Sequence, residues 1–263
     1  MMMGLNNTDE MIRSVCLGQA GFKFQVGEGV LYIDPYLSDS VERLEGSHLK
    51  RQVPVKIAPD QIHDADWVLI THSHMDHCDL DTLIPLASAS PQARFIGPNE
   101  VCEYLIINGF SKNRVLVASD DWMELNNHLR LHAVPAAHPR FEKDERGFEK
   151  YLGYIIEYKG KRIYHSGDTF LNQQLIDAVH VFKPIETALL PVNEHNYARE
   201  KMGIVGNMGL RDAFEFATIL EVKKLIPIHW DMFAPNAVFP EEIELLYQLL
   251  KPSFKMELNP TEL

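Results

Sequence analysis

"THSHMDHCD", residues 71–79, directly follows the apolar run "WVLI" and places three histidines and an aspartate within six positions. If the apolar run is a buried strand, His72 and His74 project from its end on one face, because side chains two positions apart point the same way. Asp76 and His77 are adjacent, so the chain must turn to aim both at a neighbouring point. A lone histidine in a polar loop is usually a surface or core residue. Three histidines with an aspartate at such a junction indicate a metal site.

The residues after this stretch predict a helix. Asp79 suits the N-cap position of a helix that begins at Leu80, because its carboxylate can accept the free backbone N–H groups of the first turn. The stretch then joins the end of a strand to the start of a helix. Open α/β folds place their active sites at this carboxyl edge of the sheet.

Three later strand ends carry further candidate ligands. "HAVPAAHPR" supplies His138, "YHSGDT" supplies Asp168 and "LIPIHWD" supplies His229, each after an apolar run. Taken alone, these residues could be a loop histidine, a turn aspartate and a core histidine. Together with the first motif, they complete a ligand set large enough for two ions, and we predict that they bind metal.

The pattern of elements predicts an α/β protein. Eleven short runs rich in Val, Ile, Tyr and Phe read as strands. Apolar residues at helical spacing predict four helices, at 79–90, 98–109, 208–220 and 240–251. The first part of the chain is mostly strands with two helices, and so is the second. We therefore predict two similar halves joined near residue 120 that share one core. Residues 1–263 would form a single domain, with residues 1–12 as a flexible N-terminus.

Composition excludes several classes of protein. The 263-residue chain has a net charge of -12, which disfavours binding to nucleic acid through phosphate contacts. No apolar run approaches the length of a membrane span. The three cysteines are too few and too widely spaced for a disulfide framework, which favours a reducing, cytoplasmic setting. We expect a small-molecule substrate and no nucleic-acid or membrane partner.

The motif HxHxDH, with the later His138, the "SGDT" aspartate and the terminal His229, resembles the metallo-β-lactamase superfamily. Within it, the chain most resembles the L-ascorbate-6-phosphate lactonase group. The matching segments are "LGQAGFKFQVGEGVLYIDPYLS" near the N-terminus, "FIGP" at 95–98, "YHSGD" at 164–168, "NE" at 193–194 and "IPIHWD" at 226–231. The resemblance implies a four-layer αβ/βα sandwich with two pseudo-symmetric halves and metals between the inner sheet edges.

The resemblance also implies how the ligands divide between two ions. One ion would take His72, His74 and His138, and the other would take Asp76, His77 and His229. Asp168 would bridge the two. The segment "AAHPR" around His138 follows the general superfamily pattern rather than that of the lactonase, so the resemblance leaves the substrate open.

The donor set limits the metal and the chemistry. Nitrogen and oxygen donors without a thiolate suit Zn, Mn or Fe(II) and do not choose among them. Two ions roughly 3.5–4 Å apart can hold a bridging water and lower its pKa to about 7. The resulting hydroxide would attack a carbonyl carbon or a phosphorus, and Asp76 could also steer its proton as a catalytic residue.

The polar segment 191–209 follows an apolar strand and resembles a substrate loop. Glu194 and His195 are its candidates for proton transfer or for hydrogen bonding to the substrate, although an ordinary solvated loop would look the same. Three basic residues could hold an anionic group or could simply be surface charges: Arg140, Arg199 and Lys201.

Other polar residues near the motifs could support the ligands. A ligating imidazole normally donates its second N–H to an acceptor, and Asp34, Asp79 and Asp231 are candidates. Turn or helix-cap roles are the alternative for each. Cys78 is expected to be structural, and His165 either packs in the core or lines the site.

The leading hypothesis is a binuclear metal-dependent hydrolase of a small molecule that can carry an anionic group, with lactone opening favoured. Hydrolysis of small phosphodiesters is the main alternative, and a catalytically silent metal-binding module is the next. Flavin-linked oxygen reduction is disfavoured, since no flavin domain follows and HxHxDH lacks the glutamate of the iron-binding relatives. A homo-oligomer stays open.

Overall fold

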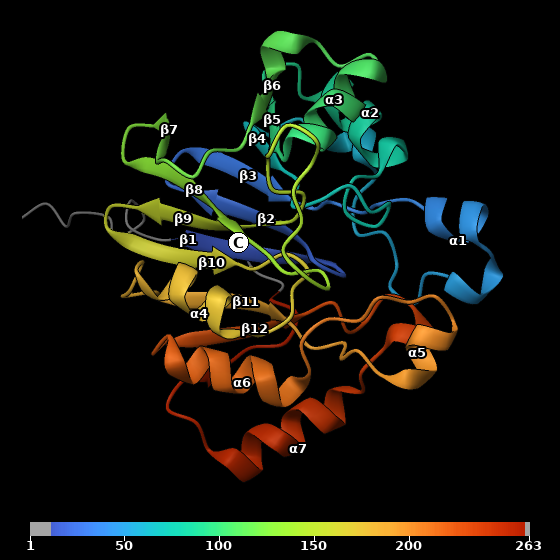
Figure 1. Cartoon of the computed structure of the whole chain (residues 1–263). Coiled ribbons are helices and arrows are strands. Elements are labelled where there is room, and N and C mark those ends of the chain that lie inside the picture. Colours follow the sequence, from blue (N-terminus) through green and yellow to red (C-terminus); the bar gives the residue numbers. More distant parts are fainter. Residues whose placement is uncertain (1–11, 261–263) are drawn as a thin grey trace, which may run out of the picture.

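The computed structural model describes residues 12–260, in which the strands form two sheets (Figure 1). The predicted flexible segment therefore lies outside the described residues except for Ile12, which begins the first strand. The first sheet has the order β1-β2-β3-β4-β5-β6. Its strands are β1 (Ile12–Gly18), β2 (Gly21–Val26), β3 (Gly29–Ile33), β4 (Trp67–Leu69), β5 (Arg94–Gly97) and β6 (Val115–Val117).

The second sheet has the order β13-β12-β11-β10-β9-β8-β7. Its strands are β7 (Met123–Asn126), β8 (Leu129–Pro135), β9 (Leu152–Tyr158), β10 (Lys161–His165), β11 (Thr187–Pro191), β12 (Lys224–Ile228) and β13 (Lys255–Met256). Each sheet starts with antiparallel pairs along the chain and continues with parallel pairs, from β3 in the first and from β10 in the second. The two pseudo-symmetric halves predicted from the sequence are confirmed.

Helices cover the outer faces of both sheets. The four predicted helices are present, although somewhat shorter than expected: α2 (Leu80–Ala89), α3 (Asn99–Ile107), α6 (Leu210–Ile219) and α7 (Pro240–Leu250). Three shorter helices were not predicted: α1 (Ser40–Glu45), α4 (Gln173–His180) and α5 (Tyr197–Lys201). Single 3-10 turns are η2 (Ser47–Leu49), η3 (Pro59–Gln61), η4 (Lys112–Arg114) and η5 (Ala234–Asn236).

The side chains between the two sheets form a shared core. Leu31 and Ile33 of β3 face Tyr154 and Ile156 of β9 in one apolar cluster, and all four are almost fully buried. A second cluster packs α2 and α3 on the first sheet, and a third packs α4, α6 and α7 on the second. Burial of each such side chain stabilises the fold by about 1.5–3 kcal/mol. The result is the predicted four-layer αβ/βα sandwich.

The carboxyl ends of the inner strands meet at one edge of the sandwich. β4 ends at Leu69, just before Thr71, and β3 ends one residue before Asp34. In the other sheet, Asp168 follows the end of β10 and His229 follows the end of β12. Each half therefore delivers polar residues to the same edge, from opposite sides. None of the helices within residues 12–260 is both long and apolar enough to cross a membrane.

Candidate metal centre

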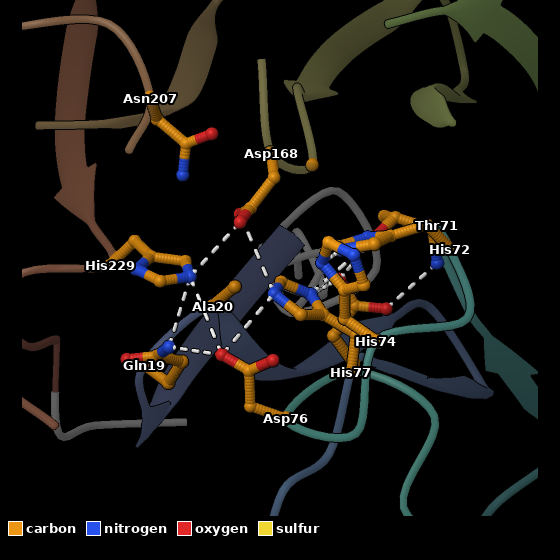
Figure 2. A network of polar contacts seen from close by, with 12 residues as sticks. Gln19, Ala20, Thr71, His72, His74, Asp76, His77, Asp168, Asn207 and His229 are labelled. Atoms are coloured by element: carbon orange, nitrogen blue, oxygen red, sulfur yellow. Dashed lines mark hydrogen bonds and ion pairs between the residues drawn. The ribbon is translucent and has the colours of Figure 1, made fainter. Parts of the chain in front are cut away.

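The seven predicted ligands converge at this edge, and Figure 2 labels all of them except His138. Their donor atoms form overlapping groups, within each of which the atoms lie no more than 4.8 Å apart. The three-histidine group contains His72, His74 and His138. The mixed group contains Asp76, His77 and His229. These are the same two sets that the family resemblance implied for two ions.

Asp168 lies between the two groups. Its Oδ1 is 3.5 Å from His77 Nε2, and its Oδ2 is 3.1 Å from His229 Nε2. The same Oδ2 is 3.7 Å from His138 Nε2, which belongs to the three-histidine group. Its carboxylate therefore reaches both groups, as a bridging ligand must.

A single carboxylate behind the site orients two of the histidines. Asp34 Oδ2 accepts a hydrogen bond from His77 Nδ1 at 2.8 Å and another from the Thr71 hydroxyl at 2.7 Å. Because the Thr71 hydrogen is used in this way, its oxygen is left to accept from His72 Nδ1, 3.0 Å away. Both imidazoles then carry a hydrogen on Nδ1 and direct Nε2 toward the site, so in the neutral form Nε2 is the ligand atom. Asp34 was one of the three predicted supporting residues.

Gln19 supports the mixed group and was not predicted. It lies in the turn between β1 and β2 with a left-handed backbone (φ 59°) and is buried. Its side-chain amide donates to Asp76 Oδ2 at 2.6 Å and lies 2.9 Å from His229 Nε2 (Figure 2). Its backbone N–H donates to Asp231, another predicted supporting residue, which thus acts through Gln19. Its neighbours in "LGQAG" carry no motif that would reveal this role.

A chain of buried amides stands behind His229. Asn236 Nδ2 lies 3.4 Å from His229 Nδ1, and its Oδ1 accepts from Asn193. Asn207 in turn donates to Asn193 at 3.1 Å. Asn193 and Asn207 belong to the polar segment 191–209, so part of that segment supports the site from behind.

Burial and charge act differently on the histidines. Burial lowers the pKa of His72 well below its usual value and lowers that of His138 to about 4. Burial also opposes protonation of His77 and His229, but the carboxylates of Asp168 and Asp76 together outweigh it, with Asp34 adding to them at His77. The pKa of His77 therefore rises well above normal and that of His229 rises to about 9. For Asp168 itself, burial favours the neutral acid, yet His229 and His77 hold its pKa well below normal.

The residues fit a bound divalent cation. His77 Nε2 and Asp168 Oδ1 are buried without a hydrogen-bond partner, and they face each other in the middle of the cluster. Buried polar atoms are normally satisfied, so two such orphans among nitrogen and oxygen donors indicate where a cation would sit.

Several other predicted residues have structural roles. Asp79 caps α2, accepting from the backbone of Asp81, and does not support a ligand. His165 is fully buried, its Nε2 2.9 Å from the carbonyl oxygen of Ala20, so it packs in the core rather than lining the site. Cys78 is buried in the apolar cluster under α2, as expected.

Glu194 and His195 do not line the cavity that faces the ligands. Glu194 lines a different cavity, beside α6 and α7, and its backbone forms an isolated bridge with Asn207. The ring of His195 packs near Phe170, and its backbone N–H donates to Asn207. Their backbones thus help to hold Asn207, and their catalytic roles stay predictions.

A cavity of about 250 Å³ opens over the ligands. His74, Asp76, His138, Asp168 and His229 line its floor. Its walls come from α1 and η2 in the first half and from the loop after α5 in the second, which Figure 1 shows at the same side of the molecule.

Comparison with known proteins identifies the family. The chain belongs to the family described as the Beta-lactamase superfamily domain, which matches residues 30–230, more than half of its length. It is similar to a UPF0173 metal-dependent hydrolase of Pyrococcus furiosus, at 28% identity over 257 residues, which cover 94% of this chain and 100% of that protein.

Two further similarities are more distant. A protein named Probable L-ascorbate-6-phosphate lactonase, from Escherichia fergusonii, is 26% identical over 93% of this chain and 67% of its own length. Igni18, a metallo hydrolase from the archaeon Ignicoccus hospitalis, has a solved structure that matches with a TM-score of 0.71 at 21% identity, covering 95% of this chain and 96% of that one. The superfamily and the fold expected from the sequence are confirmed.

Proposed function

We propose that this protein is a metal-dependent hydrolase that holds two divalent ions, one in each ligand group, and acts on a small molecule. The observation that carries this proposal is the position of Asp168, whose two oxygens lie within 3.7 Å of histidines from both groups. The name of the Pyrococcus furiosus relative supports the same class.

Bound divalent ions would supply a water of lowered pKa and a Lewis acid for the substrate oxygen. The chain's own residues prepare the site for them. Asp34 and Thr71 fix the ring orientation of His77 and His72, and Gln19 fixes Asp76. Because these side chains are held before a ligand arrives, little reorganisation is needed during reaction. Asp76 lines the cavity with a mostly buried carboxylate and is placed to accept a hydrogen bond, and so to orient a proton, next to the substrate.

Lactone opening is the reaction that we favour. The relative named as a lactonase supports it, and the cavity is small enough for one ring with a short substituent. Hydrolysis of a small phosphodiester would use the same ligands and is distinguished by experiment.

The test is metal analysis of the purified protein, followed by a hydrolysis panel of lactones, phosphodiesters and thioesters with Zn, Mn or Fe(II). We expect about two metals per chain and turnover of lactones. As a matched control, His180→Ala removes an exposed histidine at the end of α4 and should change neither metal content nor rate. A protein that binds no metal even after reconstitution would contradict the proposal, and phosphodiester turnover alone would replace the substrate.

A further inference from the structure

The walls of the cavity above the ligands are mostly apolar. Six apolar side chains line them, three from each half of the chain: Val41, Leu49 and Met75, and Ile204, Val205 and Phe233. Glu45, Gly203 and Asn236 complete the lining. The part of a substrate that does not react would lie against these groups. The six apolar side chains favour burial of hydrocarbon and offer no hydrogen bond to a polar substituent. The amide of Asn236 is already engaged, since its Oδ1 accepts from Asn193 and its Nδ2 lies 3.4 Å from His229 Nδ1.

No lysine or arginine among residues 12–260 lines this cavity. The three basic residues that the sequence suggested as anion holders are engaged or located elsewhere. Arg199 is buried and donates to the backbone oxygens of Glu194, Pro235 and Ala237. Arg140 is exposed and pairs with Glu142, and Lys201 lies over the ring of Tyr197. A phosphate group on the substrate would therefore meet no positive side chain at the walls.

The charge that the walls do carry is negative. Glu45, at the end of α1, is the one charged wall residue in the described part of the chain apart from the predicted ligands. Its side chain is exposed, so it adds a negative potential at the mouth of the cavity without the free-energy cost of burying a charge. An anionic substituent would be repelled there, and a neutral one would be unaffected.

We propose that the substrate is a small, uncharged compound whose non-reacting part is apolar, such as an alkyl-substituted lactone, and that phosphorylated lactones are excluded. This inference rests on the proposed hydrolase function and restricts its substrate class. Glu45 and the apolar walls would determine specificity, while the predicted ligands serve any substrate.

A pair of uncleaved analogues tests this directly. One is a γ-lactam that carries a butyl group, and the other is the same lactam with a phosphate monoester at the end of the butyl group. Calorimetry with the metal-loaded protein gives both dissociation constants. We expect the butyl compound to bind tighter by about tenfold or more, since the phosphate of the other compound must lose water against the apolar walls and is repelled by Glu45.

Charge variants show whether Glu45 contributes. Glu45→Lys should bring the dissociation constants of the two analogues closer together, because it replaces repulsion of the phosphate by attraction at the mouth of the cavity. Glu42→Lys changes the net charge equally on the same helix but does not line the cavity, so it should leave the ratio unchanged. Val205→Lys, at a partly exposed wall position, should weaken the butyl compound and strengthen the phosphorylated one.

The outcomes separate this inference from the proposed function. Equal or tighter binding of the phosphorylated lactam would overturn the inference, as would an identical change in Glu45→Lys and Glu42→Lys. Faster turnover of a phosphorylated lactone than of an alkyl lactone would also overturn it, while leaving the hydrolase function in place. Preference for the butyl analogue with no turnover of any ester, lactone or phosphodiester would overturn the hydrolase function alone.

Discussion

The two ligand groups differ in charge and in support, although they lie side by side. The mixed group has its own carboxylate, Asp76, and two supporting contacts, from Asp34 to His77 and from Gln19 to Asp76. The three-histidine group has no carboxylate of its own. One of its members, His138, has a buried Nδ1 without a hydrogen-bond partner, and another, His74, is exposed.

This difference predicts unequal binding of two ions. A carboxylate adds Coulomb attraction to a cation, and a hydrogen-bonded acceptor behind an imidazole raises its basicity as a ligand. The mixed group should therefore bind the first ion and the three-histidine group the second. One cluster of ligands would then offer a tight site and a weaker one side by side.

Removing the shared carboxylate should have the largest effect. Asp168→Asn keeps the size of the side chain but takes one negative charge away from both groups. Losing charge stabilisation worth several kcal/mol should reduce kcat/KM by roughly 10³-fold and metal content below two per chain. Metal analysis together with steady-state rates checks this. An active variant with two metals would show that Asp168 does not bridge.

His74→Ala should affect one group only. His74 is exposed and contributes little to the core, so the free energy of unfolding should change by no more than about 0.5 kcal/mol. The variant should retain about one tightly bound ion, in the mixed group, and lose most activity. Denaturant unfolding and metal analysis test both points. Loss of both ions would mean that the groups are not independent, and full activity would remove His74 from the ligand set.

The sequence was most informative where ligands are close together in the chain. His72, His74, Asp76 and His77 fall in one motif at a strand end, where local geometry alone brings them together. The later ligand His229 was predicted from its place at a strand end combined with the first motif. Its assignment to a particular ion needed the family resemblance, because its position depends on how the second sheet stacks on the first.

The supporting residues were harder to predict. Gln19 contacts Asp231, 212 positions away, only because the β1–β2 turn reaches the end of β12. Nothing local distinguishes it from any other turn glutamine. The polar character of a side chain also does not reveal which cavity it lines. The carboxylate of Glu194 suggested a catalytic role, but Glu194 lines a different cavity and its backbone forms a bridge with Asn207. Short helices such as α5 lie below the length at which periodicity is detectable.

Loss of the acceptor behind His77 should weaken the first ion more than the second, which Asp34 reaches only through Thr71 and His72. Asp34→Asn retains the shape of a fully buried side chain but removes the charge that holds His77 and Thr71. Outer supports of this kind change metal affinity by about 10–100-fold. Gln19→Ala, which removes a neutral amide, should have a smaller effect on the same ion. Competition with a chelator gives both affinities, and a larger loss in Gln19→Ala would reverse the relative importance of the two supports.

The pH dependence of metal binding should also separate the two groups. Without metal, the raised pKa of His229, about 9, and the raised pKa of His77 mean that both carry a proton near pH 7, paired with Asp168 and Asp76. An ion entering the mixed group must displace protons, so its affinity should rise with pH between 6 and 8, by up to about tenfold per pH unit for each proton released.

His72 and His138, in the three-histidine group, have lowered pKa values and are already neutral in this pH range, so those two ligands release no proton. Calorimetry in buffers of different ionisation enthalpy would count the protons. Because lowering the pH from 8 to 6 penalises the mixed group at two ligands, the two affinities should approach each other as the pH falls. Equal proton release by both ions would remove the asymmetry between the groups.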